Sequence, residues 1–107
     1  MGNEAAVEMF VGGLVLDPAT QAPIVVLKDE TGEVTLPIWI GALEANAIAA
    51  VLERLQLPRP MTHDLFKNLL NQIGGKLLRV EVTDIRDNTY SAVLHIEVGG
   101  NPVAIDS

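Results

Sequence analysis

The chain has 107 residues, of which 49% are hydrophobic and 20% are charged, a composition that predicts a globular protein with an ordinary core. Fourteen acidic and seven basic residues give a net charge of −7. Residues 1–60 carry eight acids and three bases, and residues 61–107 carry six and four, so neither part has the basic character of a strong nucleic-acid binder. The absence of cysteine excludes disulfides and thiolate chemistry.

No segment is typical of export or membrane insertion. No apolar run approaches the ~20 residues that span a bilayer. The N-terminus has no basic region followed by an apolar stretch, as a secretory signal would have. We therefore expect a cytoplasmic protein with no membrane partner.

The first part of the chain predicts three strands. Residues 7–16 are apolar at both alternating positions, as in a central strand, and a Gly-Gly pair within them indicates a bulge. Residues 24–28 and 33–40 flank a turn. Pro37 cannot donate to a ladder, so the second of these strands is expected near an edge or a bulge.

Two helices are expected in the middle of the chain. Residues 41–56 are rich in alanine and predict a helix that Pro58 and Pro60 end. Residues 62–73 predict a second helix, which stops at a glycine pair. The expected apolar stripes are Ile48, Val51, Leu52 and Leu55 in the first helix, and Leu65, Phe66, Leu69, Leu70 and Ile73 in the second.

The last third predicts further strands at residues 76–86, 89–98 and 102–106. The resulting order, β-β-β-α-α-β-β-β, indicates an α+β fold in which mostly antiparallel or mixed sheet strands flank a central pair of helices. We expect residues 1–107 to form one compact domain.

The apolar residues also predict the register of the hairpin after residue 76. A two-residue loop would mix apolar and polar side chains on each face. A three-residue loop at residues 87–89 sets Val82 opposite Leu94 and Val80 opposite Ile96, which keeps one face apolar. The second register is our prediction, and it also pairs Glu81 with His95, Arg79 with Glu97 and Arg86 with Tyr90.

A histidine and an aspartate adjoin at the start of the second predicted helix. Thr62 as N-cap and Asp64 in the first turn stabilise a helix start by about 1 and about 0.3–1 kcal/mol, which explains both residues without chemistry. Adjacent helical side chains diverge by about 100°, so His63 and Asp64 are expected not to face each other. A catalytic role for these two residues remains the alternative.

Glu44 is placed unusually, because it lies four residues before Ile48, in the predicted apolar stripe of the first helix. One interpretation is local. With Gly41 as N-cap, Glu44 is the third helical residue, and its side chain can reach back to a free amide. The other interpretation is a desolvated carboxylate that acts as a general base or metal ligand. The residues alone leave both open.

The remaining polar residues have ordinary interpretations. Asp84 and Arg86 predict an ion pair that closes the end of the sheet, and His95 is interpreted as a surface histidine beside Glu81. The chain contains no phosphate-binding loop, zinc-protease motif or serine-hydrolase motif. Composition and spacing alone therefore assign no activity.

Four blocks carry a more specific resemblance: "LPIWIGALEANAIAAVLE", "RPMTHDLFKNLL", "VTDIRDNTYSAVL" and "VAID". In this order and spacing, from Val7 to Ser107, the chain resembles the bifunctional nuclease (BFN) domain family. That resemblance implies a compact α+β domain that forms homo-oligomers and a nuclease acting on RNA and DNA. The matching residues are Pro37, Ile38, Trp39, Ile40, Gly41, Glu44 and Ala45, then Arg59, Pro60, Thr62, His63, Asp64 and Leu65, and finally Asp84, Arg86, Tyr90 and Asp106.

Phosphodiester hydrolysis needs an activated water and positive charge near phosphorus, so the resemblance implies candidate residues. The catalytic candidates are Glu44, His63 and Asp64. Arg59, Lys67 and Arg86 are candidates for phosphate binding, and a short turn brings the first two close to His63. Oxygen ligands for Mg²⁺ or Mn²⁺ would come from Glu44, Asp64 and Asp106.

Family members continue beyond the last matching aspartate with an Arg-Pro-Ser-Asp-Ala-type segment that opens another helix. We therefore expect the domain to be truncated at its C-terminus, with apolar surface that favours self-association. The alternative function is a non-catalytic binding or oligomerisation domain of unknown partner. The acidity of the chain and the structural explanation of Thr62 and Asp64 favour that alternative, and the family resemblance favours the nuclease.

Overall fold

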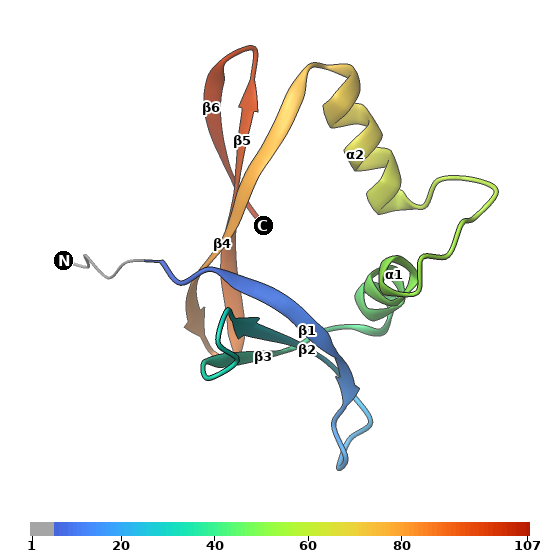
Figure 1. Cartoon of the computed structure of the whole chain (residues 1–107), viewed down its shortest axis with the longest axis vertical. Helices are drawn as coiled ribbons and strands as arrows, with labels where there is room; N and C mark the ends of the chain where they lie inside the picture. The colour runs from blue at the N-terminus through green and yellow to red at the C-terminus, as the bar shows by residue number, and fades with distance from the viewer. Residues whose placement is uncertain (1–5) are drawn as a thin grey trace. The chain divides into compact units, whose positions relative to one another are not determined.

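The computed structural model describes residues 6–107 (Figure 1). The described residues form two helices and six strands in the predicted α+β order, and all strand pairs are antiparallel. No helix in this part of the chain is long and apolar enough to cross a membrane. The elements are β1 (Met9–Leu16), β2 (Pro23–Asp29), β3 (Thr35–Trp39), α1 (Ala42–Leu52), α2 (Thr62–Gln72), β4 (Gly75–Arg86), β5 (Thr89–Val98) and β6 (Asn101–Asp106).

The contacts between residues divide the chain into two compact units, unit 1 (Met1–Leu57) and unit 2 (Pro58–Ser107). Unit 1 contains the sheet β1-β2-β3 and α1, and unit 2 contains α2 and the sheet β4-β5-β6. Each unit is therefore described by itself, and the single domain over residues 1–107 stays a prediction.

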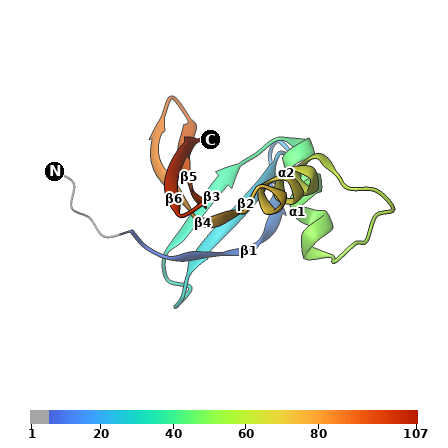
Figure 2. The same ribbon diagram turned by 90° about the horizontal axis from the view of Figure 1, so that it is seen from above.

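In unit 1 the central strand is β2. Ile24 and Val25 point to opposite faces of β2, and each is only 7% exposed, so both faces of this strand are covered. The strand with Pro37, β3, lies at an edge, as predicted, and the pairing of β1 is interrupted by the predicted bulge. The central position expected for residues 7–16 was wrong, because β1 forms the other edge. Figure 2 shows α1 beside this sheet, and α1 contacts β2.

α1 ends four residues earlier than predicted. Its last turn closes through two backbone hydrogen bonds, from the Arg54 N–H to the Val51 carbonyl at 3.0 Å and from the Leu55 N–H to the Ala50 carbonyl at 2.9 Å. This pattern is the Schellman motif, with Arg54 in the left-handed conformation at φ 55°. The helix therefore stops by a local backbone motif before the prolines. Three residues of the predicted stripe are exposed, and they are Val51, Leu52 and Leu55. The buried residue of α1 is Ala45.

The loop after β1 is held by a carboxylate. The Asp17 side chain accepts a hydrogen bond from the Ala19 amide at 2.9 Å and another from the Trp39 indole N–H at 3.1 Å. These two bonds, the Ala19 bond first, hold the pKa of Asp17 below its ordinary value of 3.8.

The lowered pKa gives an acid-sensitive contact. Because the folded-state pKa is depressed, its contribution to stability is present above pH 3.8 and is lost as the pH falls through the folded-state value. We expect the fluorescence of Trp39, the only tryptophan, to change in that acidic range. In Asp17→Asn this step should be missing. An acid titration with an identical step in both proteins would contradict the assignment.

The hairpin β4–β5 corrects the predicted register. Arg86 pairs with Thr89, so the loop has two residues, and Asp87 and Asn88 have φ values of 51° and 61°. Two residues with positive φ are the signature of a type I′ turn, whose twist matches that of the strands. The predicted three-residue loop was therefore wrong. The predicted cross-strand pairs were also wrong, since Glu81 lies opposite Val93, Arg79 opposite His95 and Arg86 opposite Thr89.

Two bulges explain how the sheet keeps one apolar face despite the shorter loop. The pairing shifts between Leu77 and Arg79 and again between Val82 and Asp84. Each shift inserts one extra residue and reverses the alternation of the faces. The apolar face of this sheet is formed by Leu77, Val80, Val82, Ile85, Tyr90, Ala92, Leu94, Ile96, Val103 and Ile105, and its polar face includes Lys76, Arg79, Glu81, Asp84, Arg86, His95, Glu97 and Asp106.

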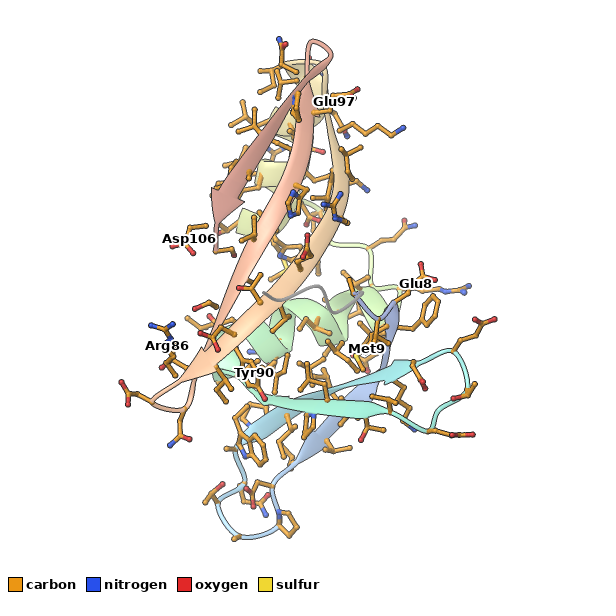
Figure 3. All side chains as sticks on the ribbon, turned by 90° about the vertical axis from the view of Figure 1, so that its left-hand side faces the viewer. Glu8, Met9, Arg86, Tyr90, Glu97 and Asp106 are labelled. Atoms are coloured by element: carbon orange, nitrogen blue, oxygen red, sulfur yellow. The ribbon has the colours of Figure 1, made fainter. Side chains whose placement is uncertain are left out.

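α2 connects to this sheet through a tight turn. It ends at Gln72, one residue before the predicted end, and Gly74 takes a left-handed conformation at φ 75°. A Cβ built on Gly75 would collide with the Leu70 side chain, so a larger residue where the helix meets β4 would require Leu70 to move. In Figure 3, which views the sheet from one side, α2 lies behind it. α2 therefore lies on one side of the sheet of unit 2.

Candidate functional site

The start of α2 carries the His-Asp pair, and a carboxylate caps it. Met61 is the N-cap, and its carbonyl accepts the first helical hydrogen bond from Leu65 at 2.9 Å. The Asp64 Oδ2 atom accepts a hydrogen bond from the Met61 amide at 2.9 Å, which satisfies a backbone donor at the helix end. The prediction of Thr62 as N-cap was therefore wrong by one residue, because Asp64 at the third helical position does the capping.

The side chains of His63 and Asp64 come closer than predicted. His63 Nε2 lies 3.6 Å from Asp64 Oδ1, although the two residues are adjacent on the helix. The expectation that they do not face each other was wrong, because the capping bond turns the Asp64 carboxylate back along the helix start. At 3.6 Å the contact is longer than a hydrogen bond, and both side chains are partly exposed. The pair is thus a loose, solvent-accessible imidazole–carboxylate contact.

Two basic side chains lie on the same short segment. Arg59 precedes His63 by four residues, and Lys67 follows it by four in α2, on the same helix face. Both are exposed, and among the described residues neither forms an ion pair. The positive charge of Lys67 is therefore available to an anionic ligand on the His63 side of α2, and that of Arg59 is available on the loop before the helix.

Glu44 belongs to unit 1 and sits at the start of α1. Gly41 is the N-cap, as predicted, and its carbonyl accepts a 2.9 Å hydrogen bond from the Ala45 amide. The Glu44 side chain folds back over Gly41, so that a Cβ built on Gly41 would collide with Glu44 Oε1. Glu44 is exposed, so its carboxylate is not desolvated as the second interpretation would require. The side chain lies over its own helix start, as the local interpretation expects, but among the described residues it accepts no hydrogen bond from the Gly41 amide.

The other candidates lie on the polar face of the sheet in unit 2. Arg86 Nε is 2.8 Å from Asp84 Oδ2, which confirms the predicted ion pair. Its arginine is 85% exposed, so the pair contributes little to stability. Asp106 pairs with Val93 near the end of β6. Figure 3 shows Arg86 near the β4–β5 turn and Asp106 on the neighbouring strand β6.

The carboxylates do not form a ready cation site. Among residues 6–107 no three or more His, Asp or Glu side chains gather so that they could hold a metal ion. One oxygen of Asp64 is already engaged by the Met61 amide. The metal set of Glu44, Asp64 and Asp106 stays a prediction.

A second charged group on the polar face contains His95, Glu81 and Arg79, and only the contact of the first two was predicted. His95 Nε2 lies 2.7 Å from Glu81 Oε1, which confirms that these two residues are neighbours. The same oxygen lies 3.2 Å from Arg79 Nε. Sequence reasoning missed the contact with the arginine, although the spacing of two residues along one strand already places Arg79 and Glu81 on the same face.

Comparisons with known proteins place the fold in a family. A model of the bifunctional nuclease domain matches residues 25–107. The chain is 35% identical over 99 residues to the uncharacterized protein Rv1829 of Mycobacterium tuberculosis strain H37Rv, covering 89% of this chain and 60% of that protein. It is 24% identical over 85 residues to Bifunctional nuclease 1 of Oryza sativa subsp. indica, covering 79% of this chain and 26% of that protein.

The chain spans 60% of the length of the mycobacterial relative and 26% of that of the rice relative. The family match itself covers well over half of the chain and includes the starts of both helices, β4, β5 and β6. The chain therefore belongs to the bifunctional nuclease domain family.

Proposed function

We propose that this chain hydrolyses phosphodiester bonds of RNA and DNA at the start of α2. The observation that carries the proposal is the imidazole of His63, 3.6 Å from a carboxylate and flanked along the segment by two exposed basic side chains. The family and the printed name of the rice relative support the reaction class. The proposed roles are general base for His63 and phosphate binding for Arg59 and Lys67.

The chemistry follows from what each group can do. His63 takes a proton from water as the water oxygen bonds to phosphorus. The bond from phosphorus to the leaving sugar oxygen breaks, and that oxygen takes a proton from solvent and departs as a hydroxyl group. Negative charge grows on the phosphoryl oxygens, and Arg59 and Lys67 neutralise it. Asp64 is a positioning residue, because one of its oxygens holds the Met61 amide and the other lies beside the imidazole.

The net charge of −7 limits how substrate binds. Few phosphates can be neutralised by the segment around α2, so affinity for nucleic acid is weak and falls only modestly with salt. A short single strand fits this limited contact better than a long duplex. Mg²⁺ or Mn²⁺ would lessen the repulsion by screening phosphates, and it would do so without a dedicated protein site.

A cleavage assay tests the proposed reaction. Purified chain is incubated with end-labelled single-stranded RNA and DNA, with Mg²⁺, with Mn²⁺ or with chelator. We expect cleavage of both substrates, and little loss in Glu44→Gln, because Glu44 is exposed and folded over its own helix start. If no preparation cleaves either substrate under any of the three conditions, the proposed reaction is wrong.

The second candidate function is a non-catalytic binding or oligomerisation domain. The observation that favours it is the hydrogen bond from the Met61 amide to Asp64, because it gives that carboxylate a structural role. In this case labelled nucleic acid would not be cleaved, whether or not the chain binds it. The same assay, read alongside a gel-shift measurement, separates the two functions.

A further inference from the structure

The start of α2 offers one nitrogen that can take a proton from a nucleophile. His63 Nε2 is turned towards Asp64, at 3.6 Å from Oδ1, and Nδ1 has no partner among residues 6–107. The other side chain in residues 58–67 that can act as a base is Asp64 itself, and its Oδ2 atom already accepts the Met61 amide at 2.9 Å. The segment therefore presents a single free general base.

A single base gives little hold on a water nucleophile. Water must be aimed at phosphorus in line with the bond that breaks, and this orientation takes a second polar group besides the base. Arg59 and Lys67 can hold a phosphate, but both are cations without an acceptor atom for a water proton. Thr62 adjoins His63 on the helix, so its side chain diverges by about 100°. The segment is therefore poorly equipped to orient water.

RNA carries a nucleophile that needs no such group. The 2′-hydroxyl is fixed by the ribose next to the phosphate that it attacks, and DNA lacks it. A well-oriented nucleophile within the same molecule reaches an effective concentration of about 10⁵–10⁸ M, far above that of any dissolved reactant. For a site with one base, this advantage outweighs the use of water.

The position of Lys67 suits the same reaction. Lys67 follows His63 by four residues in α2, and residues at this spacing are neighbours whose Cβ atoms lie about 5–6 Å apart. A phosphate held by the ammonium group of Lys67 therefore lies beside the imidazole. The 2′-hydroxyl on the ribose of that phosphate is then within reach of His63, and Lys67 neutralises the charge that develops on the phosphoryl oxygens.

We propose that RNA is cleaved at this site by its own 2′-hydroxyl, and that unpaired RNA is therefore preferred to DNA. This mechanism rests on the proposed function, in which His63 is the general base. His63 Nδ1 takes the 2′-hydroxyl proton as the bond from O2′ to phosphorus forms and the bond from phosphorus to O5′ breaks. The O5′ atom takes a proton from solvent. One product ends in a 2′,3′-cyclic phosphate and the other in a 5′-hydroxyl, whereas water remains the nucleophile on DNA.

A DNA strand that contains one ribonucleotide tests the nucleophile. The native chain is incubated with this end-labelled strand, and the products are identified by mass spectrometry. We expect cleavage after the ribonucleotide to be at least about 100-fold faster than at any deoxynucleotide, with a cyclic phosphate on the product. A 2′-O-methyl group on that ribonucleotide blocks the attack, so it should lower the rate to that of an all-DNA strand.

Two histidine variants assign the cleavage to this site. His63→Ala should lose the fast cleavage at the ribonucleotide, and His95→Ala, purified in the same way, should keep it. Fast cleavage that persists in His63→Ala belongs to another site or to a contaminating ribonuclease and would overturn the proposal. Equal rates at ribonucleotides and deoxynucleotides, or an unchanged rate with the 2′-O-methyl strand, would overturn the 2′-hydroxyl mechanism and leave the proposed function standing. Cleavage of no strand at all would overturn both.

Discussion

Replacing His63 with alanine is expected to slow the cleavage of RNA by about 10²–10⁴-fold, the usual contribution of a general base. The helix start should survive the change. Its capping bond joins Asp64 to the Met61 amide and does not involve the imidazole, which contacts only the other carboxylate oxygen, at 3.6 Å. The loss should therefore appear in the turnover rate, with the far-ultraviolet circular dichroism unchanged.

The chain offers a matched control for this variant, because it contains only two histidines. His95 is also partly exposed and also lies beside a carboxylate, at 2.7 Å from Glu81, but no exposed basic residue without an ion pair adjoins it on its strand. His95→Ala should keep the native cleavage rate. Equal losses in the two variants would remove His63 from the proposed site, and so would native activity in His63→Ala.

Val25 lies in the centre of β2, and Val25→Ala is expected to lower the free energy of unfolding of unit 1 by about 2 kcal/mol. The side chain is 7% exposed, and removal of two methyl groups loses about 1.6 kcal/mol of burial, to which a cavity adds. Urea unfolding followed by Trp39 fluorescence measures the change, since Trp39 lies on the adjoining strand β3 and reports on this sheet.

Val34 is the matched control for Val25. It is the same residue type in the same unit, it is 49% exposed, and its carbonyl bonds the Asp29 amide at 3.0 Å whatever side chain it carries. Val34→Ala should cost no more than about 0.5 kcal/mol. If the two variants unfold at the same urea concentration, β2 is not the core of unit 1.

The order of elements was predictable because each carries a local signal. Apolar segments bounded by turn residues marked the strands, alanine content marked α1, and Gly74 marked the end of α2 at a left-handed position that favours glycine. The edge position of β3 followed from Pro37, since its nitrogen has no hydrogen to donate. These signals depend on residue type alone, so they can be recognised in the sequence without knowledge of the tertiary contacts.

The failures share a different cause. The hairpin register assumed uninterrupted pairing, whereas two bulges in β4 each shift the pairing by one residue. The end of α1 depended on Arg54 adopting a conformation that arginine seldom favours. Both features are set by backbone conformation and backbone hydrogen bonds, for which the sequence carries no specific residue.

The sequence predicted which residues belong to the candidate site, and the structure corrected how their side chains are arranged. The basic residues flanking His63 could be read from the spacing of four on either side. The contact between His63 and Asp64 could not, because it depends on the carboxylate reaching back to Met61. Glu44 changed most, from a residue of the apolar stripe to an exposed one, since α1 presents Ala45 to the interior of unit 1.

The most direct test of the nuclease claim is to follow RNA cleavage across the size-exclusion elution of the purified native chain. If the chain itself hydrolyses phosphodiester bonds, the rate in each fraction rises and falls in proportion to the concentration of the 11.5 kDa polypeptide. Cleavage that elutes away from this polypeptide, or none in its peak fractions, would contradict the proposed function.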